Sequence, residues 1–303
     1  MSDLGGLTFR RPREEDLPKA AAVFGAEEQA VRGRVTFGVE ELRDWWRLYD
    51  LAEGSWLVEN EAGEPVAAAG LLARGDDFSA WIGVDPRYNG RGISTELLAR
   101  TEQRVRELGG DRLRTGMLAE NACARELLES LGFHEVRRFF RMQIDFDTPP
   151  AAPQPVDGIE IATFRMEDAR RFHDAMNEAF ADDWGFVPMP FEEWKRYRLE
   201  TGDPDTSLWF LAWGNGDVAG VVRCEPNKFG GGFVGALGVR QQWRGRGIGM
   251  ALLQHAFAEF HRRAASRVSL GVDAANPSGA TRLYERAGMH VVSEDVLFEK
   301  ALT

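Results

Sequence analysis

Cysteine is scarce in this 303-residue sequence, and long apolar segments are absent from it. The two cysteines, Cys123 and Cys224, are too few for a disulfide scaffold and lack the paired CxxC spacing of a zinc site. No run of 18 apolar residues occurs, and the first 16 residues, MSDLGGLTFRRPREED, are polar and charged without an apolar core. We therefore expect a cytoplasmic protein without a structural disulfide, a metal site or a membrane partner.

An excess of positive charge is also absent. The 48 Asp and Glu residues outnumber the 37 Lys and Arg residues, and the formal net charge is −11. Nucleic acid phosphates and anionic membrane surfaces repel such a chain. We expect no nucleic acid partner, although a locally basic site for a small anion is compatible with this charge balance.

The remaining composition is typical of a globular protein with two domains. Hydrophobic residues make up 44% of the chain and charged residues 28%, which is sufficient for a buried core. At roughly 150 residues per domain, the length predicts two domains. The segment 147–155 holds four prolines in nine residues and is predicted to be extended. We expect a domain at residues 1–146, a linker at 147–157 and a second domain at 158–303, with 146 residues in each domain.

The two halves repeat the same sequence pattern. Residues 89–94, NGRGIS, match residues 244–249, RGRGIG, and the matched glycines at 90 and 245 give an offset of 155. Asn121 and Asn276 match at the same offset. An offset that is kept over about thirty residues indicates a tandem duplication of one fold.

Hydrophobic periodicity in the second half alternates between strand and helix patterns. The predicted order is β-α-α-β-β-β-α-β-α-β, and the first half follows the same order. This order predicts an α+β fold in which each half forms a mixed, mostly antiparallel sheet flanked by helices. The predicted strands are 159–163, 207–213, 217–225, 233–239, 268–272 and 291–298, and the predicted helices are 167–180, 191–199, 250–263 and 276–287.

The glycine-rich segment 244–249 follows a predicted strand and opens a predicted helix. A helix N-terminus presents N–H groups and a positive dipole, and glycines allow an anion to approach them. The spacing GxGxG differs from the dinucleotide fingerprint GxGxxG, and the Gly-Lys-Ser/Thr of a P-loop is absent. The segment is therefore either a plain turn or an anion-binding loop of another kind.

This segment resembles the pyrophosphate-binding signature of the GNAT acetyltransferase superfamily, [Arg/Gln]-x-x-Gly-x-[Gly/Ala]. The predicted strand order is also similar to that of GNAT domains, and the repeat extends the resemblance over nearly the whole chain. It implies that acetyl-CoA is the cosubstrate, with its pyrophosphate on the loop, pantetheine between splayed fourth and fifth strands, and no metal. The residues that the resemblance implies for acetyl-CoA are Leu237, Gly238, Val239, Arg244, Gly245, Arg246, Gly247, Ile248, Gly249 and Asn276.

The two halves differ at the helix that follows the fifth predicted strand. Asn276 and Pro277 predict a helix start, with Asn276 as N-cap. Tyr284 lies on the apolar face of this helix, where the first half has Leu128. Tyr284 is either a core aromatic or, as the GNAT resemblance implies, the general acid that protonates the coenzyme A thiolate.

The first half also departs from the loop signature. It has Asn89 where Arg or Gln is expected and Ser94 where Gly or Ala is expected, although Gly90 and Gly92 remain. Together with Leu128, these departures predict that the first half is a degenerate, catalytically silent GNAT domain.

The general base is less clearly marked. Glu225, at the end of the third predicted strand, and Asp273, after the fifth, are the candidates, and both are equally compatible with surface charges at strand ends. The mycothiol synthases, which are tandem GNAT proteins, use a glutamate that begins the fourth strand. Phe233 occupies that position here, which argues against mycothiol synthesis.

Substrate specificity in this superfamily usually depends on the segment between the first two helices. Here Asp182, Asp183 and Trp184 combine carboxylates with an aromatic ring, a pattern suited to a cationic amine. Helix termination and core anchoring explain the same residues. His173, His255 and His261 fall in predicted helices without further metal ligands, and we interpret them as structural.

The resemblance implies an acetyl-CoA-dependent N-acetyltransferase that transfers the acetyl group directly to a primary amine of a small molecule, in the C-terminal domain. The alternatives are a non-catalytic acyl-CoA-binding regulatory protein and an enzyme with a longer acyl donor. The sequence leaves the choice between monomer and homodimer open.

Overall fold

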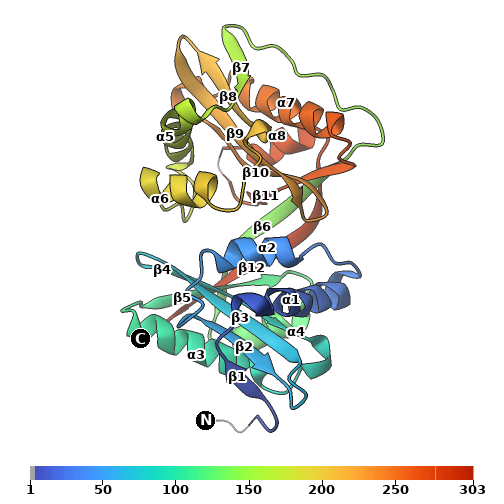
Figure 1. Cartoon of the computed structure of the whole chain (residues 1–303), viewed down its shortest axis with the longest axis vertical. Helices are drawn as coiled ribbons and strands as arrows, with labels where there is room; N and C mark the ends of the chain where they lie inside the picture. Colours follow the sequence, from blue (N-terminus) through green and yellow to red (C-terminus); the bar gives the residue numbers. More distant parts are fainter. Residues whose placement is uncertain (1–3, 277, 303) are drawn as a thin grey trace. The chain divides into compact units, whose positions relative to one another are not determined.

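The computed structural model describes residues 4–276 and 278–302 of the chain. The chain forms two compact units, drawn in Figure 1, which we call the N unit (Met1–Phe139 with Glu294–Thr303) and the C unit (Phe140–Ser293). Each unit contains one mixed sheet with helices packed against it. The predicted α+β fold with two repeated units is confirmed.

The N unit has the strand order β1-β2-β3-β4-β5-β12. All neighbouring strands in it are antiparallel except β4 and β5, which run parallel. Its strands are β1 (Thr8–Arg10), β2 (Ser55–Glu59), β3 (Pro65–Arg74), β4 (Asp77–Val84), β5 (Arg112–Leu118) and the part of β12 (His290–Ala301) from residue 294 onward, and its helices are α1 (Leu17–Arg32), α2 (Val39–Trp46), α3 (Ile93–Glu107) and α4 (Ala122–Ser130).

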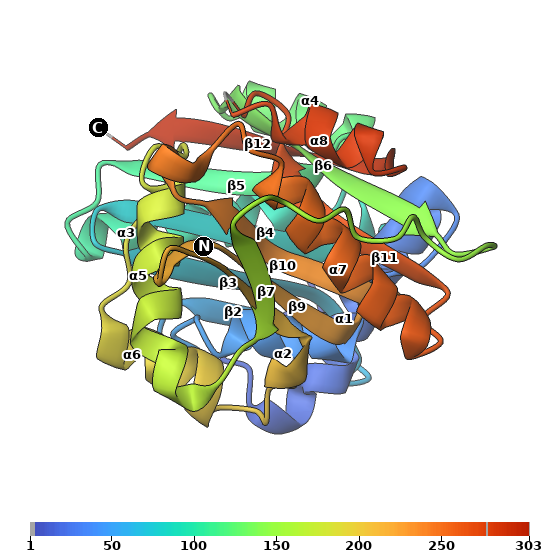
Figure 2. The same cartoon turned by 90° about the horizontal axis from the view of Figure 1, so that it is seen from above.

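The C unit repeats this plan with the order β6-β11-β10-β9-β8-β7, and its β10 and β11 form the parallel pair. Figure 1 shows α5 and α6 on one side of this sheet and α7 and α8 on the other, and Figure 2 shows α5 and α7 apart in the same way. Its strands are β6 (His134–Asp145) from residue 140 onward, β7 (Ile159–Thr163), β8 (Trp209–Gly214), β9 (Asp217–Lys228), β10 (Gly231–Val239) and β11 (Arg267–Asp273), and its helices are α5 (Ala169–Phe180), α6 (Phe191–Lys195), α7 (Ile248–Arg262) and α8 (Ala280–Arg286).

The boundaries of the compact units differ from those expected for the sequence halves, because each unit takes its last strand from the other half. In the N unit, residues 295–301 pair with β5, and Phe298 is fully buried in the core. In the C unit, Met142 is fully buried, and the Phe146 N–H donates to the Ser266 carbonyl over 2.8 Å. Alternating hydrophobicity specifies which face of a strand is buried but not which sheet it joins, so the exchange is invisible in the sequence.

The predicted start of the helix that carries Tyr284 is wrong. The helix α8 begins at Ala280, with Gly279 in the left-handed conformation (φ 75°) at its N-cap. The Asn276 side chain instead accepts hydrogen bonds from the N–H (2.8 Å) and hydroxyl (2.5 Å) of Ser278. Such local side-chain bonds compete with helix formation, which explains the later start. Pro277 lies outside the described residues.

Candidate functional site

The glycine-rich loop of the C unit forms a sharp turn between β10 and α7. Gly245 and Gly247 adopt φ of 76° and 83°, a conformation that residues with a Cβ rarely take. Gly247 is the N-cap of α7, so the first N–H groups of a 15-residue helix face the loop. Gly90 and Gly92 have φ of 77° and 80° before α3. Both units therefore keep a backbone shape suited to an anion.

Two arginines of this loop have different surroundings. The Arg244 side chain donates from Nε to the Val239 carbonyl over 3.1 Å and from Nη2 to the Ala179 carbonyl over 2.9 Å. It thereby joins the end of β10 to the end of α5. Arg246 is exposed, and its guanidinium carbon lies 4.9 Å from the ring centroid of Trp243. Both arginines are exposed, but only Arg244 is tied to backbone carbonyls in the recorded hydrogen bonds.

The parallel strands β10 and β11 separate toward their carboxyl ends. Their pairing runs from Gly232 with Val268 to Val234 with Leu270, and β10 then has an irregularity between Val234 and Ala236. The Arg240 N–H donates to Ala219 on the β9 side over 3.0 Å. Because N–H groups alternate along a strand, those of Leu237 and Val239 point to the side from which β11 diverges. Polar backbone groups therefore line the opening.

Tyr284 of α8 is buried, with 7% of its surface exposed. Burial, followed by the negative charge of Asp183, raises the pKa of its hydroxyl well above the usual value. Among the described residues, the structure records no hydrogen bond to this hydroxyl. The residue is buried and its hydroxyl has no recorded hydrogen bond, so the hydroxyl is available to a bound ligand.

Asp183 is the carboxylate whose negative charge raises the pKa of Tyr284. Burial raises its pKa above the usual range; the charge of Arg244 opposes this shift, and the carboxylates of Asp273 and Asp182 reinforce it. Three of the predicted site residues, Asp183, Asp273 and Tyr284, are therefore close enough to interact electrostatically. Asp182 lies 3.9 Å from Arg244, and Trp184 is exposed.

Two polar contacts hold the segments that carry these carboxylates. His173 of α5 is buried, and its Nε2 lies 2.8 Å from the Met189 carbonyl, which fixes the loop between α5 and α6. Asp273 accepts the Ala275 N–H over 2.9 Å at the end of β11. The structural role expected for His173 is thus to position the Asp183 loop.

Glu225 has a different environment from Asp183. Its carboxylate accepts hydrogen bonds from Arg223 over 2.5 Å and from Lys228 over 2.9 Å. Burial raises its pKa, but the two positive charges and their hydrogen bonds outweigh this effect and bring the pKa to about 2. A carboxylate this acidic is a weak proton acceptor at neutral pH.

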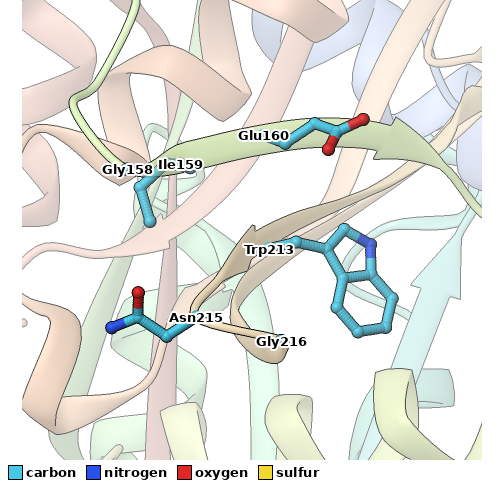
Figure 3. Close-up of a pocket in the computed structure, with 6 residues that line it drawn as sticks. All are labelled: Gly158, Ile159, Glu160, Trp213, Asn215 and Gly216. Atoms are coloured by element: carbon cyan, nitrogen blue, oxygen red, sulfur yellow. The ribbon is translucent and has the colours of Figure 1, made fainter.

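A cavity of about 560 Å³ lies elsewhere in the C unit, at β7 and the turn between β8 and β9 (Figure 3). None of the predicted site residues line it. Its lining residues are Gly158, Ile159, Glu160, Trp213, Asn215 and Gly216. The cavity is therefore separate from the opening between β10 and β11.

The part of the chain that the structure describes contains no group of three His, Cys, Asp or Glu side chains that could hold a metal ion. In the same part, no helix is long and apolar enough to span a membrane.

Comparisons with known proteins identify the family of the chain. The acetyltransferase (GNAT) family model matches residues 23–133 and 169–289. The mycothiol acetyltransferase of Thermobispora bispora is 30% identical over 296 residues, which cover 95% of this chain and 97% of that protein. That of Acidothermus cellulolyticus is 32% identical over 242 residues, covering 74% of this chain and 72% of the relative.

Solved structures show the same fold over the full length. The crystal structure of a GCN5-related N-acetyltransferase from Sphaerobacter thermophilus has a TM-score of 0.85 and 33% identity, covering 98% of this chain and 96% of that one. A tandem GNAT protein from the clavulanic acid biosynthesis pathway has a TM-score of 0.76 at 16% identity, covering 98% of this chain and 99% of that one.

The fold, the family match and these relatives therefore define an acyltransferase. The chain belongs to the GNAT acetyltransferase family and is a tandem-domain member of it, with one family match in each unit.

Proposed function

We propose that the C unit transfers the acetyl group of acetyl-CoA directly to a primary amine of a small molecule. The observation that carries this proposal is Tyr284, a buried residue whose hydroxyl has no recorded hydrogen bond in the described chain and whose pKa is raised by burial and then by the charge of Asp183. A proton donor and a proton acceptor within electrostatic range of each other are what acyl transfer from a thioester to an amine requires.

Most of the predicted cofactor residues have a role in this proposal. The N–H groups at the start of α7, with Gly245, Gly247 and the exposed Arg246, hold the pyrophosphate of acetyl-CoA. The N–H groups of Leu237 and Val239 polarise the thioester carbonyl in the opening between β10 and β11. The contact of Asn276 with pantetheine stays a prediction.

The transfer needs one proton to leave the amine and one to reach the sulfur. The amine nitrogen attacks the thioester carbon, the C–N bond forms and the C–S bond breaks. Asp183 takes the amine proton, and Tyr284 gives its proton to the departing thiolate. Asp183 suits the base role better than Glu225, because its pKa is raised whereas that of Glu225 is about 2. Asp273 is the alternative base.

The acceptor is proposed only as a small primary amine. The name of the curated relatives associates them with mycothiol. This chain has Phe233 where the mycothiol synthases are expected to carry a glutamate, and the carboxylates beside Tyr284 come from other segments. We therefore leave mycothiol unassigned as the product.

The test is Tyr284→Phe, with Tyr88→Phe in the N unit as the matched control. Coenzyme A release from acetyl-CoA is measured across a panel of primary amines. We expect kcat to fall by about a hundredfold or more in Tyr284→Phe while acetyl-CoA binding stays unchanged. An unchanged kcat and pH profile would remove Tyr284 from the mechanism. Tight acetyl-CoA binding without amine-dependent release would favour the regulatory protein instead.

A further inference from the structure

Two neighbouring glycines form a floor beside the proposed reaction site. Gly235 of β10 and Gly271 of β11 directly follow Val234 and Leu270, the last pair that the two parallel strands make. A Cβ on Gly271 would meet only open space, whereas a Cβ on Gly235 would collide with the guanidinium of Arg223 and the carboxylate of Glu225. The space above Gly271 on β11 is therefore open, whereas the side chains of Arg223 and Glu225 fill the space above Gly235 on β10.

The charged groups and the open floor share one face of the sheet. Arg223 is paired with Trp209 of β8, whose ring packs against Phe172 of α5 and Trp194 of α6. Glu225 lies two residues beyond Arg223 and therefore on the same face. The face that carries Arg223 and Glu225 is thus the one that α5 and α6 cover.

Strand β11 continues this face toward the acidic end of the site. Phe233 is paired with both Glu225 and Ser269, which places Ser269 on the same face. Gly271 and Asp273 follow it at intervals of two residues. An amine substrate that lies over Gly271 therefore has the Asp273 carboxylate at one end and the Arg223 guanidinium at the other.

The Nη2 group of Arg223 has no recorded hydrogen-bond acceptor in the described part of the chain. Only 6% of the residue is exposed, and its Nη1 donates to Glu225 over 2.5 Å. The structure records no hydrogen bond to its Nη2 among the residues it describes. Because a guanidinium is always charged, an Nη2 without a recorded hydrogen bond can donate to an anion.

Ser269 provides a second donor on the same floor. It is 3% exposed, and its buried Oγ has no hydrogen-bond partner in the described structure. Arg223 comes from β9 and Ser269 from β11, so the two donors approach the floor from opposite sides. Arg223 Nη2 and Ser269 Oγ are therefore the two donors that this face of the sheet offers to an anion.

We propose that the acceptor amine carries a carboxylate or phosphate group, which binds at Arg223 and Ser269 while its amine faces Asp183 and Asp273. This inference rests on the proposed function and specifies its acceptor. Ser269 and Asp273 are four residues apart on β11, so their Cα atoms are separated by roughly 13 Å, and the side chains at the two ends shorten the gap that the acceptor spans. Glu225 acts as a positioning residue that orients the Arg223 guanidinium.

The experiment compares amines that differ only in their second group. Coenzyme A release is measured with hexylamine, 1,6-diaminohexane and 6-aminohexanoate, and with glucosamine and glucosamine 6-phosphate. The variants are Arg223→Met, Arg223→Lys and Ser269→Ala, and the control is Arg262→Met at an exposed ion pair on α7. The melting temperature of each variant is also recorded with 6-aminohexanoate and with hexylamine, which gives a readout of binding without turnover.

We expect the wild-type chain to prefer 6-aminohexanoate or glucosamine 6-phosphate over its matched amine by about tenfold or more in kcat/KM. Arg223→Met is expected to lower kcat/KM for the anionic acceptors by about tenfold to hundredfold and to change that for hexylamine little. Arg223→Lys is expected to retain part of the preference, Ser269→Ala to weaken it about threefold to tenfold, and Arg262→Met to leave it intact.

Equal use of hexylamine, or an equal loss on all acceptors in Arg223→Met, would overturn the anion subsite while leaving the acetyltransferase function in place. If Arg223→Met does not fold, Arg223→Lys and Ser269→Ala decide the question. Absence of coenzyme A release from every amine would refute the proposed function instead. In that case the melting temperatures decide the subsite, which stands only if 6-aminohexanoate stabilises the wild-type chain more than it stabilises Arg223→Lys and Ser269→Ala.

Discussion

The indole ring of Trp81 lies directly against Gly116, its parallel neighbour on β5. Trp81 also contacts Trp45 of α2, with ring centroids 5.1 Å apart. At the offset of 155 between the repeats, the matched residues in the C unit are Ala236 and Gly271, and Gly271 is open. The N unit therefore fills with aromatic side chains the space that the C unit leaves free.

This difference predicts the behaviour of Trp81→Ala. Removing a half-buried indole should lower the free energy of unfolding by about 2 to 4 kcal/mol, somewhat below the range for fully buried rings. Acetyl transfer by the C unit should persist, and the N unit should gain no activity because Leu128 cannot donate a proton. Denaturant unfolding and amine-dependent thiol release measure the two effects, with Leu108→Ala at an exposed site as control. Faster turnover in Trp81→Ala would contradict a silent N unit.

The repeat, the fold class and the glycine loop could be predicted from the sequence because each depends on local residue types. Gly245 and Gly247 are required by their positive φ angles, and this requirement is visible as spacing along the chain. The coupling of Asp183 to Tyr284 depends on how a loop folds back over a sheet. The sequence marks Asp183 as a substrate residue but contains no signal for its neighbour.

The identity of the general base is a second feature that the sequence alone does not determine. The sequence marks Glu225 and Asp273 as candidate bases and Asp183 only as a substrate residue, and residue type alone does not rank these carboxylates as bases. Their environments in the structure distinguish them. Arg223 and Lys228 lower the pKa of Glu225, whereas burial and nearby carboxylates raise the pKa of Asp183. The spacing of Arg223 and Glu225, two residues apart on a strand, was the one available signal that they share a face.

The exchanged strand β12 predicts where its core residues contribute stability. Phe298 is fully buried in the N unit, although it lies in the second half of the sequence. Phe298→Ala should destabilise the chain by about 3 to 5 kcal/mol and reduce the hydrogen-exchange protection of β5 in particular. Val291→Ala, at an exposed position of the same strand, is the control. Loss of protection in β8 and β9 with β5 unaffected would be incompatible with the exchange.

The raised pKa of Asp183 predicts the acidic limb of the pH–rate profile. A base must be ionised to accept a proton, so kcat/KM should fall as the pH drops through a pKa above the usual range of aspartate. Asp183→Asn should lower kcat by about a hundredfold or more and remove this limb. The control is Asp157→Asn at an exposed turn. A limb that persists unchanged in Asp183→Asn would assign the base to another group, with Asp273 tested next.

The raised pKa of Asp183 also affects the stability of the folded chain. The pKa of Asp183 is raised in the folded chain, so the native state binds this proton more tightly than the unfolded state does. Stability should therefore fall as the pH rises from the unfolded to the folded pKa, and the ionised carboxylate is destabilising above that range. Asp183→Asn should raise the melting temperature at neutral pH, and thermal unfolding at several pH values measures this. A lower melting temperature would mean that the charge is stabilised by contacts other than those described.

The open space over Gly271 predicts that a side chain placed there blocks the acceptor without disturbing the fold. A Cβ at this position meets no atom within 4 Å, so Gly271→Leu should fold with nearly unchanged stability. Because the leucine would occupy the floor on which the amine is proposed to lie, KM for the amine should rise about tenfold or more while acetyl-CoA binding is retained.

Gly5→Leu, at another open glycine, is the matched control. Steady-state kinetics with the amine varied, combined with calorimetric titration of acetyl-CoA, separates the two effects. An unchanged KM in a folded Gly271→Leu would place the acceptor elsewhere, because a substrate lying over Gly271 has no room beside four added carbons.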